Sequence, residues 1–343
     1  MKNVWSKISL YESKDLVSKF YEEKHDRELS AGKAEEIVSH ITQGREYFSS
    51  AKQADNVVSP LLFYYGVVAF CRGLILFLDP FARVTSLKPS HGLRVKNWTQ
   101  KLSDGIEEVP NLNVEITSGT FSKLWEVTEN IERSSIYIAP YPNRTKIKQY
   151  GGKEDSNNLI TIKEILARIP ELQNIYENTF DDYSKCYNAI VFCLSEQTDI
   201  AVLETSIGLP NKELVRDDFG LPKDIKTRKK EKHNFAGNLE NISFRIIHSS
   251  NEEFYNRVPF VKNDRKNNIF AVAPLADNLN FSSLLTIYII SYAIGMLVRY
   301  YPTHWMSMIT SSKGDFSYPL LKEAIAVIEY KFPKLIIEEI ERR

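Results

Sequence analysis

The 343 residues carry 44 basic and 44 acidic side chains, and 43% of the residues are hydrophobic. This hydrophobic content excludes a generally disordered chain, and the balanced charge gives no long-range attraction to nucleic acids or other polyanions. The three cysteines, Cys71, Cys186 and Cys193, are too few and too irregularly spaced for a disulfide framework or a zinc site. We therefore expect buried free thiols in a reducing compartment. The N-terminus lacks an apolar signal segment, which favours a cytoplasmic protein.

The first third of the chain has the pattern of helices. Residues 12–24 and 31–54 are amphipathic with a helical period, and residues 60–78 are apolar almost all round. A helix that is apolar on every side must be covered by other parts of the protein. Residues 113–117 have the composition of a short strand. We expect 1–132 to form an N-terminal helical region.

The sequence pattern changes in the middle of the chain. Residues 133–160 are rich in Pro, Gly, Asn and Lys, which predicts a long exposed loop or linker. Residues 161–275 begin with a short helix and then alternate β-branched and aromatic runs with turn residues. This pattern predicts an α+β region with a small antiparallel sheet. Within it, 222–233 holds six Lys or Arg against two acids, so we expect a charged linker there.

The last segment, 276–343, predicts helices that pack on the N-terminal region. Residues 278–298 carry no charge, but their polar start leaves only about 15 strongly apolar positions, short of a membrane span. Arg72 lies near the middle of the other apolar helix, where lipid would oppose it. We therefore expect two buried helices and no membrane. The predicted fold is α+β and helix-dominated, with a helical body from both chain ends and a small antiparallel β-sheet inserted in the second half.

Six segments follow one another along most of the chain. They are GREYFSSA (44–51), SPLLFYYGVVAFCRGLILF (59–77), PSHGL (89–93), IKEILARIPEL (162–172), RYYPTHW (299–305) and FPKLIIEEI (332–340). Together they resemble the YaaC-like family of bacterial proteins. The resemblance implies a bacterial cytoplasmic location and a type of fold more than it implies an activity. It also implies a setting beside phage-defence genes.

The sequence lacks the signature motifs of common enzymes. It has no G-x-x-x-x-G-K-[ST] loop, no G-x-G-x-x-G, no G-x-S-x-G and no H-E-x-x-H. Its six histidines are scattered, and no two have metal-ligand spacing on a helix. We therefore expect no cofactor and no dedicated metal site, and we favour a protein that is not an enzyme.

Arg72 is the one charge within an otherwise apolar helix. A buried guanidinium needs a carboxylate, carbonyl groups or a ligand, because leaving it unpaired costs several kcal/mol. Tyr64 and Tyr65 precede it by about two helical turns on overlapping faces. The three side chains are suited to line a pocket for a phosphate or a carboxylate. The alternative is a structural ion pair, for example with Glu46.

A second candidate is the segment Ser90-His91-Gly92-Leu93-Arg94. His91 follows a turn, Gly92 permits close approach of a backbone, and Arg94 supplies positive charge nearby. These residues are suited to hold an anion or to transfer a proton. The alternative is that His91 only satisfies carbonyl groups at a helix end.

Arg299 and His304 have the R-x4-H spacing of HEPN-type ribonucleases. In such an enzyme the His acts as a general base on the ribose 2′-hydroxyl, and the Arg stabilises charge on the phosphate. Pro302 breaks the helix between them, so the two side chains need not converge. The spacing also arises easily by chance.

The charged segment is a candidate contact for nucleic acid or for an acidic partner. Its basic residues are Lys226, Arg228, Lys229, Lys230 and Lys232. A flexible arm of this kind would bind phosphates less tightly as salt rises. The alternative is a solvated linker without a function of its own.

The function that these observations favour is non-catalytic. We expect an interaction or ligand-sensing subunit of a bacterial cytoplasmic complex with protein partners, in a phage-defence setting, because no convincing acid, base, nucleophile or metal cluster is present. The alternatives are a HEPN-like ribonuclease and a small-anion or nucleotide-binding protein. The oligomeric state is left open.

Overall fold

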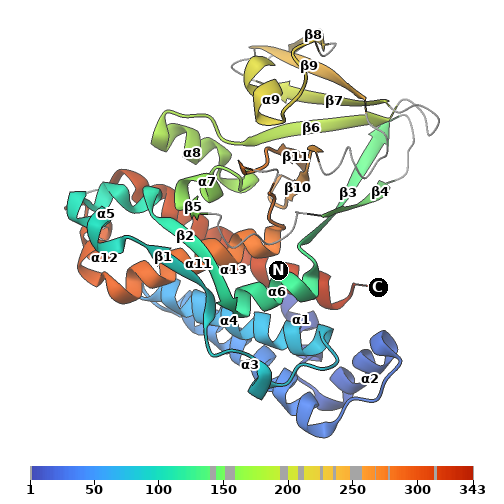
Figure 1. Ribbon diagram of the computed structural model, residues 1–343, viewed down its shortest axis with the longest axis vertical. Helices are drawn as coiled ribbons and strands as arrows, with labels where there is room; N and C mark the ends of the chain where they lie inside the picture. Colours follow the sequence, from blue (N-terminus) through green and yellow to red (C-terminus); the bar gives the residue numbers. More distant parts are fainter. Residues whose placement is uncertain are drawn as a thin grey trace. The chain divides into compact units, whose positions relative to one another are not determined.

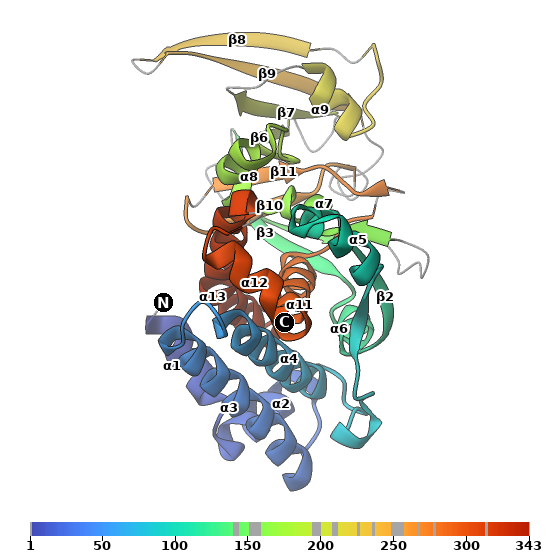
Figure 2. The ribbon, with the colours of Figure 1, turned by 90° about the vertical axis from the view of Figure 1, so that its left-hand side faces the viewer.

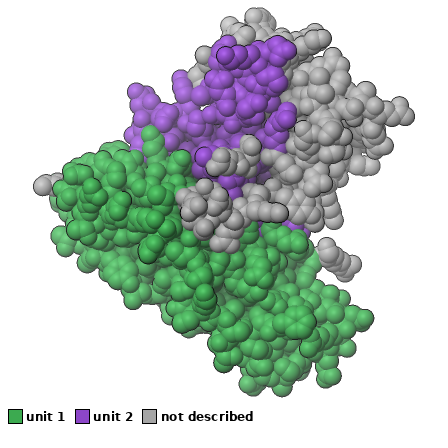
Figure 3. Space-filling view, viewed as in Figure 1, with its two compact units in different colours: residues 1–129, 154–166, 283–343 green, residues 130–153, 167–282 purple. Residues whose placement is uncertain are grey.

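The structure is a computed structural model that describes most of the chain. The described residues are 2–139, 144–150, 159–193, 200–207, 212–224, 227–234, 237–247, 257–266, 268–276, 279–312 and 315–342. Of these, the residues 2–3, 134–139, 144–150, 190–193, 200–207, 212, 227–234 and 237–247 are described by their backbone alone. The chain divides into two compact units, shown in different colours in Figure 3.

Unit 1 combines the two ends of the chain, residues 1–129, 154–166 and 283–343. Its main helices are α1 (Lys2–Leu10), α2 (Lys14–His25), α3 (Ala31–Gln53), α4 (Ser59–Leu78), α11 (Ser283–Tyr300), α12 (Pro302–Ile309) and α13 (Tyr318–Ile340). Figure 1 gives the order of these elements along the chain. The predicted α+β, helix-dominated fold, with a helical body from both chain ends, is therefore confirmed.

Helix α4 lies in the centre of unit 1. It contacts α3, α11 and α13, and Figure 2 shows it between α3 and α11. The apolar side chains around α4 are therefore covered on most sides, as the sequence pattern predicts. Glycines permit this close packing: a Cβ atom on Gly66 would lie 2.5 Å from the ring of Phe48, and one on Gly44 would lie 2.7 Å from the ring of Phe70.

A three-stranded antiparallel sheet belongs to unit 1. Its strands are β1 (His91–Lys96), β2 (Asn113–Gly119) and β5 (Leu159–Thr161), in the order β1-β2-β5. The shorter helices of this unit are η1 (Val84–Ser86), α5 (Trp98–Asp104), η2 (Ile106–Asn111), α6 (Thr120–Thr128), α7 (Ile162–Leu166) and η5 (Asp315–Ser317). Helix α6 follows β2 directly and contacts α4, so the sheet places the start of α6 beside the central helix.

Unit 2, residues 130–153 and 167–282, contains the larger sheet. Its strands are β3 (Ile131–Ala139), β4 (Arg144–Tyr150), β6 (Cys186–Cys193), β7 (Ile200–Ile207), β8 (Thr227–Asn234), β9 (Gly237–Ile247), β10 (Phe260–Asn263) and β11 (Asn268–Val272). The order is β10-β11-β6-β7-β9-β8, and β3 joins it by pairing with β6 and β4. Among the described residues, the pairs of this sheet are antiparallel except β3 with β6, which is parallel. Its helices are η3 (Pro170–Leu172), α8 (Gln173–Phe180) and α9 (Lys212–Asp218).

Two segments differ from their sequence-based predictions. Residues 133–160 are not a loop throughout, because β3 and β4 form a hairpin with Ile131 opposite Tyr150. Residues 222–233 are not a linker throughout, because β8 begins at Thr227 and pairs with β9. In both cases the abundance of Lys and turn residues outweighed the strand pattern. β8 ends the strand order, and lysines are favoured on such edge strands because they discourage further pairing.

Helices α4 and α11 are long and apolar enough to cross a membrane by length and composition. In the structure, however, 67% of the most apolar stretch of α4 and 83% of that of α11 are buried within the protein. This degree of burial is typical of the core helices of a soluble domain.

Candidate functional site

Arg72 lies on the least buried face of α4. Tyr65, Val68 and Arg72 are half-buried, while most of the other residues of this helix are fully buried. The Nε of Arg72 donates a long hydrogen bond of 3.5 Å to Thr120 Oγ1. Glu46, the suggested ion-pair partner, instead pairs with Arg45 at 2.7 Å. Among the described residues, no carboxylate forms an ion pair with Arg72.

Thr120 connects Arg72 to the strand that begins at His91. This threonine is the first residue of α6 and is only 4% exposed. Its Oγ1 donates to the carbonyl oxygen of Ser90 at 3.1 Å, and its backbone N–H donates to the same oxygen at 3.0 Å. Because the hydroxyl proton is used in this way, a lone pair of the oxygen faces the guanidinium of Arg72.

His91 lies among tyrosines from the two apolar helices. Its Nδ1 is hydrogen-bonded to the hydroxyl of Tyr64 on α4. The hydroxyl of Tyr288 on α11 donates to the carbonyl oxygen of His91 at 2.8 Å, and the ring of Tyr292 lies 5.8 Å from the imidazole. With Nδ1 engaged, Nε2 is the ring atom left to meet a ligand.

Two positive charges lie close enough to His91 to change its titration. Burial is the main reason why the pKa of His91 is lowered, and the charges of Arg299 and Arg72 lower it further. On α3, the pKa of His40 is also lowered, first by burial and then by Arg72, while Glu36 acts in the opposite direction. The region around Arg72 therefore concentrates positive charge.

The tyrosine hydroxyls of this cluster stay protonated. Burial raises the pKa of Tyr64 and of Tyr288, and it raises the pKa of Tyr292 to about 12. Tyr65 is half-buried, with its ring 5.7 Å from that of Tyr47 and 5.8 Å from that of Tyr64. These rings line the site around His91. The hydroxyls of Tyr64, Tyr288 and Tyr292 stay protonated and so do not act as bases.

Arg94 has a different environment from Arg72 and His91. It is exposed on β1, opposite Glu115 of β2, and its Nε donates to Glu115 Oε2 at 2.8 Å. Lys96 pairs with the same carboxylate at 2.6 Å. Of the predicted ligand-binding residues, the structure thus brings together Tyr64, Tyr65, Arg72 and His91, and it gives Arg94 a carboxylate partner elsewhere.

Arg299 and His304 have separate neighbours. The guanidinium of Arg299, in the last turn of α11, lies 5.0 Å from the centre of the Tyr300 ring. The imidazole of His304 lies 5.7 Å from the ring of Tyr301. Pro302 begins the new helix α12, and no hydrogen bond joins Arg299 to His304 in the described part of the chain.

Arg299, a candidate residue of the ribonuclease hypothesis, instead contributes positive charge near His91, whose pKa it lowers. Tyr288, Tyr292 and Arg299 are spaced by four and by seven residues, which puts them on one face of α11. That spacing was the only sequence signal for the association. Thr120, whose contact with Arg72 depends on the tertiary structure, had no such signal.

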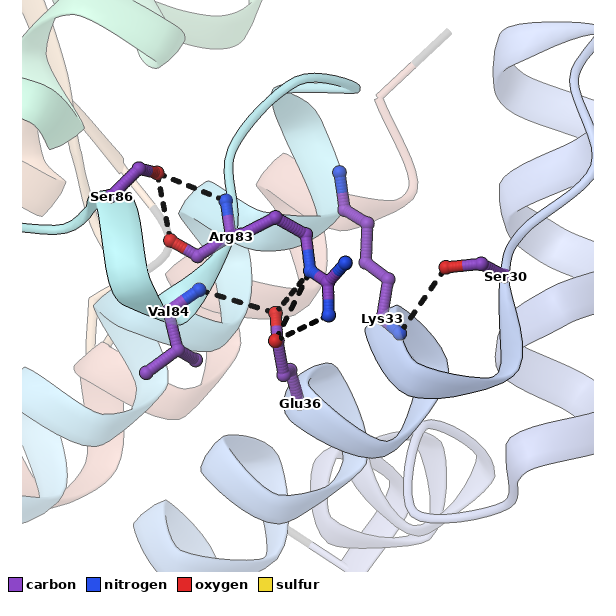
Figure 4. A network of polar contacts seen from close by, with 6 residues as sticks. All are labelled: Ser30, Lys33, Glu36, Arg83, Val84 and Ser86. Atoms are coloured by element: carbon purple, nitrogen blue, oxygen red, sulfur yellow. Dashed lines mark hydrogen bonds and ion pairs between the residues drawn. The ribbon is translucent and has the colours of Figure 1, made fainter.

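A cavity of about 710 Å³ lies beside Thr120. It is lined by Ile75, Asp79, Phe81, Ala82, Ser86, Leu87, Lys88, Ile116, Thr117, Ser118, Gly119, Thr120, Ser122, Lys123 and Glu126. The segment 81–88 forms one wall of this cavity, and Glu36 of α3 holds it in place through hydrogen bonds (Figure 4). The carboxylate of Glu36 accepts from Arg83 Nη2 at 2.7 Å and from the backbone N–H of Val84 at 3.2 Å.

The basic residues of the charged segment cannot be placed in a site. Lys226 lies outside the described residues, and Arg228, Lys229, Lys230 and Lys232 fall on β8, whose side chains also lie outside them. Their contact with nucleic acid or an acidic partner stays a prediction. Among the residues that were searched, no group of three or more His, Cys, Asp or Glu is arranged to hold a metal ion.

Comparison with known proteins identifies a family. A family model described as YaaC-like protein matches residues 9–340, nearly the whole chain. No curated protein and no solved structure matches the chain. The family match covers all six segments that carry the sequence resemblance. Helices α4, α6 and α11 and strand β1 also fall within it. The chain therefore belongs to the YaaC-like protein family.

Proposed function

We propose that this protein is a non-catalytic, ligand-sensing subunit of a bacterial cytoplasmic complex, and that it senses a small anion. The anion would bind at Arg72, His91 and Arg299 in unit 1. The observation that carries the proposal is the guanidinium of Arg72, which has no carboxylate partner among the described residues and forms one long hydrogen bond to Thr120.

Electrostatics favour an anion at this place. Arg72 and Arg299 both lower the pKa of His91, so both contribute positive potential at the imidazole. At 4 Å, two opposite unit charges attract by about 4 kcal/mol at the effective dielectric constant of a protein surface. A phosphate, sulfate or carboxylate group would therefore be attracted to this positive potential, and a planar guanidinium is well suited to bind such groups.

Binding is better supported than catalysis. The hydroxyls of Tyr64, Tyr288 and Tyr292 have raised pKa values and do not act as bases or nucleophiles near neutral pH. The hydrogen bond between the Tyr64 hydroxyl and Nδ1 of His91 engages one nitrogen of the imidazole. The partner proteins and the phage-defence setting are proposals that rest on the family resemblance alone.

Isothermal titration calorimetry with inorganic phosphate tests the anion site. We expect the wild-type protein to bind phosphate and Arg72→Met to bind it at least about tenfold more weakly, which corresponds to about 1.4 kcal/mol. Arg94→Met is the matched control, because it removes the same charge from an arginine that pairs with Glu115. Equal binding by the wild type and Arg72→Met, or equal losses in both variants, would contradict the proposal.

A further inference from the structure

The cavity beside Thr120 and the guanidinium of Arg72 share this threonine. Thr120 lines the cavity and also accepts the hydrogen bond from Arg72 Nε. Ile75 of α4 and Asp79, the C-cap of this helix, line the cavity and follow Arg72 by three and seven residues, so they continue the same side of the helix. An anion bound at Arg72 would therefore lie close to Thr120, at the edge of this cavity.

The charges within the cavity compensate one another. Lys123 pairs with Asp79 at 2.8 Å and with Glu126 at 2.8 Å. Apart from the exposed Lys88 on its wall, the charged side chains of the cavity are therefore paired with one another. A ligand in the cavity needs no second charged group to neutralise them. A volume of about 710 Å³ falls in the range of small-molecule sites.

The lining suits a ligand with hydroxyl groups. Besides carboxylates that accept hydrogen bonds, it is lined by hydroxyl side chains from three elements. Those of Ser86, Thr120 and Ser122 donate to backbone carbonyl oxygens and can accept from a ligand, whereas Thr117 and Ser118 keep their hydroxyl protons for one. Phe81 lies on the wall with 83% of its surface exposed and offers a flat apolar face. Sugar rings combine hydroxyl groups with apolar C–H faces, which an aromatic ring and carboxylates together can bind.

We propose that the anion is attached to a hydroxylated, sugar-like body, and that this body occupies the cavity while its anionic group meets Arg72. This inference rests on the proposed function and names the class of its ligand: a sugar phosphate, either free or as part of a nucleotide. An anion without such a body would fill only the end of the site next to Arg72.

The test compares three probes by calorimetry: inorganic phosphate, ribose 5-phosphate and ribose. We expect the wild type to bind ribose 5-phosphate at least about tenfold more tightly than phosphate, a gain of about 1.4 kcal/mol. Ser118→Trp, which places a large side chain at an exposed position on the cavity wall, should remove most of this gain and leave phosphate binding unchanged. Arg72→Met should weaken both anions.

A second blocking variant and a control guard against misfolding. Glu126→Trp fills the cavity from α6, and Gln100→Trp places the same side chain at an exposed position of α5 outside the cavity. We expect Glu126→Trp to act like Ser118→Trp and Gln100→Trp to act like the wild type. Adenosine monophosphate as a fourth probe distinguishes the sources, because only a nucleotide site gains from the base.

The outcomes separate the two proposals. Equal affinity of the wild type for phosphate and ribose 5-phosphate, or an undiminished gain in both blocking variants, would overturn this inference and leave the anion site intact. Absence of binding of every phosphate probe to the wild type would instead overturn the proposed function itself.

Discussion

Replacement of Arg72 by Met tests whether this arginine supports the fold or serves a ligand. The substitution keeps a long unbranched side chain and removes the charge. In the structure it loses one hydrogen bond of 3.5 Å to Thr120, a contact worth about 0.5 kcal/mol or less at that length. It also removes a half-buried charge, whose desolvation opposes folding and so offsets that loss.

We therefore expect Arg72→Met to have a free energy of unfolding within about 1 kcal/mol of the wild type, with any change on the stabilised side. If Arg72 instead formed a structural ion pair, its loss would cost about 3–5 kcal/mol. The assay is urea unfolding followed by tryptophan fluorescence, in a buffer free of phosphate and sulfate and with the m-values compared. A loss of 3 kcal/mol or more would refute the reasoning.

Three further predictions concern the core, a buried lysine and the ribonuclease hypothesis. Gly66→Ala should destabilise the protein by about 1–2 kcal/mol in the same urea assay, because its Cβ would lie 2.5 Å from the buried ring of Phe48, whereas Gly32→Ala, whose Cβ would lie at an ordinary contact distance of 3.4 Å from Arg83 Nη2, should not. The pKa of Lys33 is lowered to about 8, chiefly by burial, so the unfolded chain binds more protons between pH 8 and 10.5 and stability should rise with pH in that window. Lys33→Met should abolish this rise, and an unchanged pH slope would contradict the assignment. In an assay that separates the fragments of a labelled RNA on a gel, His304→Ala should give the same fragments as the wild type. If the wild type cleaves the RNA and this variant does not, the ribonuclease hypothesis would be restored.

The helices of unit 1 could be predicted because their signals are local. Ser30 caps α3 through the backbone N–H of Lys33, and the helix begins at Ala31 as its sequence pattern predicts. The prediction for 60–78 misses α4 by a single residue at its start, where Pro60 suits the first turn. Burial of an all-round apolar helix follows from its composition alone.

The hairpin of β3 and β4 and the pairing of β8 could not be predicted in the same way. Strand formation there depends on partners elsewhere in the chain, such as β6 for β3 and β9 for β8. Charged and turn-forming residues dominate the local composition of both segments. Propensity is a weak guide where long-range pairing decides the outcome.

Part of the candidate site was visible in the sequence. Arg72 is conspicuous because a charge within an apolar helix demands an explanation, and Tyr64 follows from its helical spacing. The closeness of His91 and Arg299 was not visible, because it depends on how α11 packs against α4. That packing is tight: a Cβ atom on Gly295 would lie 2.7 Å from the Cβ of Tyr64.

Protonation of His91 makes the affinity of the proposed anion site depend on pH, which can be measured. The groups that face His91 are Tyr64 and Arg72 on α4 and Tyr288, Tyr292 and Arg299 on α11. In the free protein burial and the two arginines keep the pKa of His91 below 6.5. A bound anion stabilises the protonated imidazole and raises this pKa, so the affinity should rise as the pH falls toward the pKa of the free protein.

The most direct test of the anion site is a calorimetric titration with sulfate, whose charge does not change between pH 6 and pH 8. We predict that the wild type binds sulfate more tightly at pH 6 than at pH 8, and that Arg72→Met loses this binding at both pH values. Sulfate affinity that is independent of Arg72 and of pH would contradict the account.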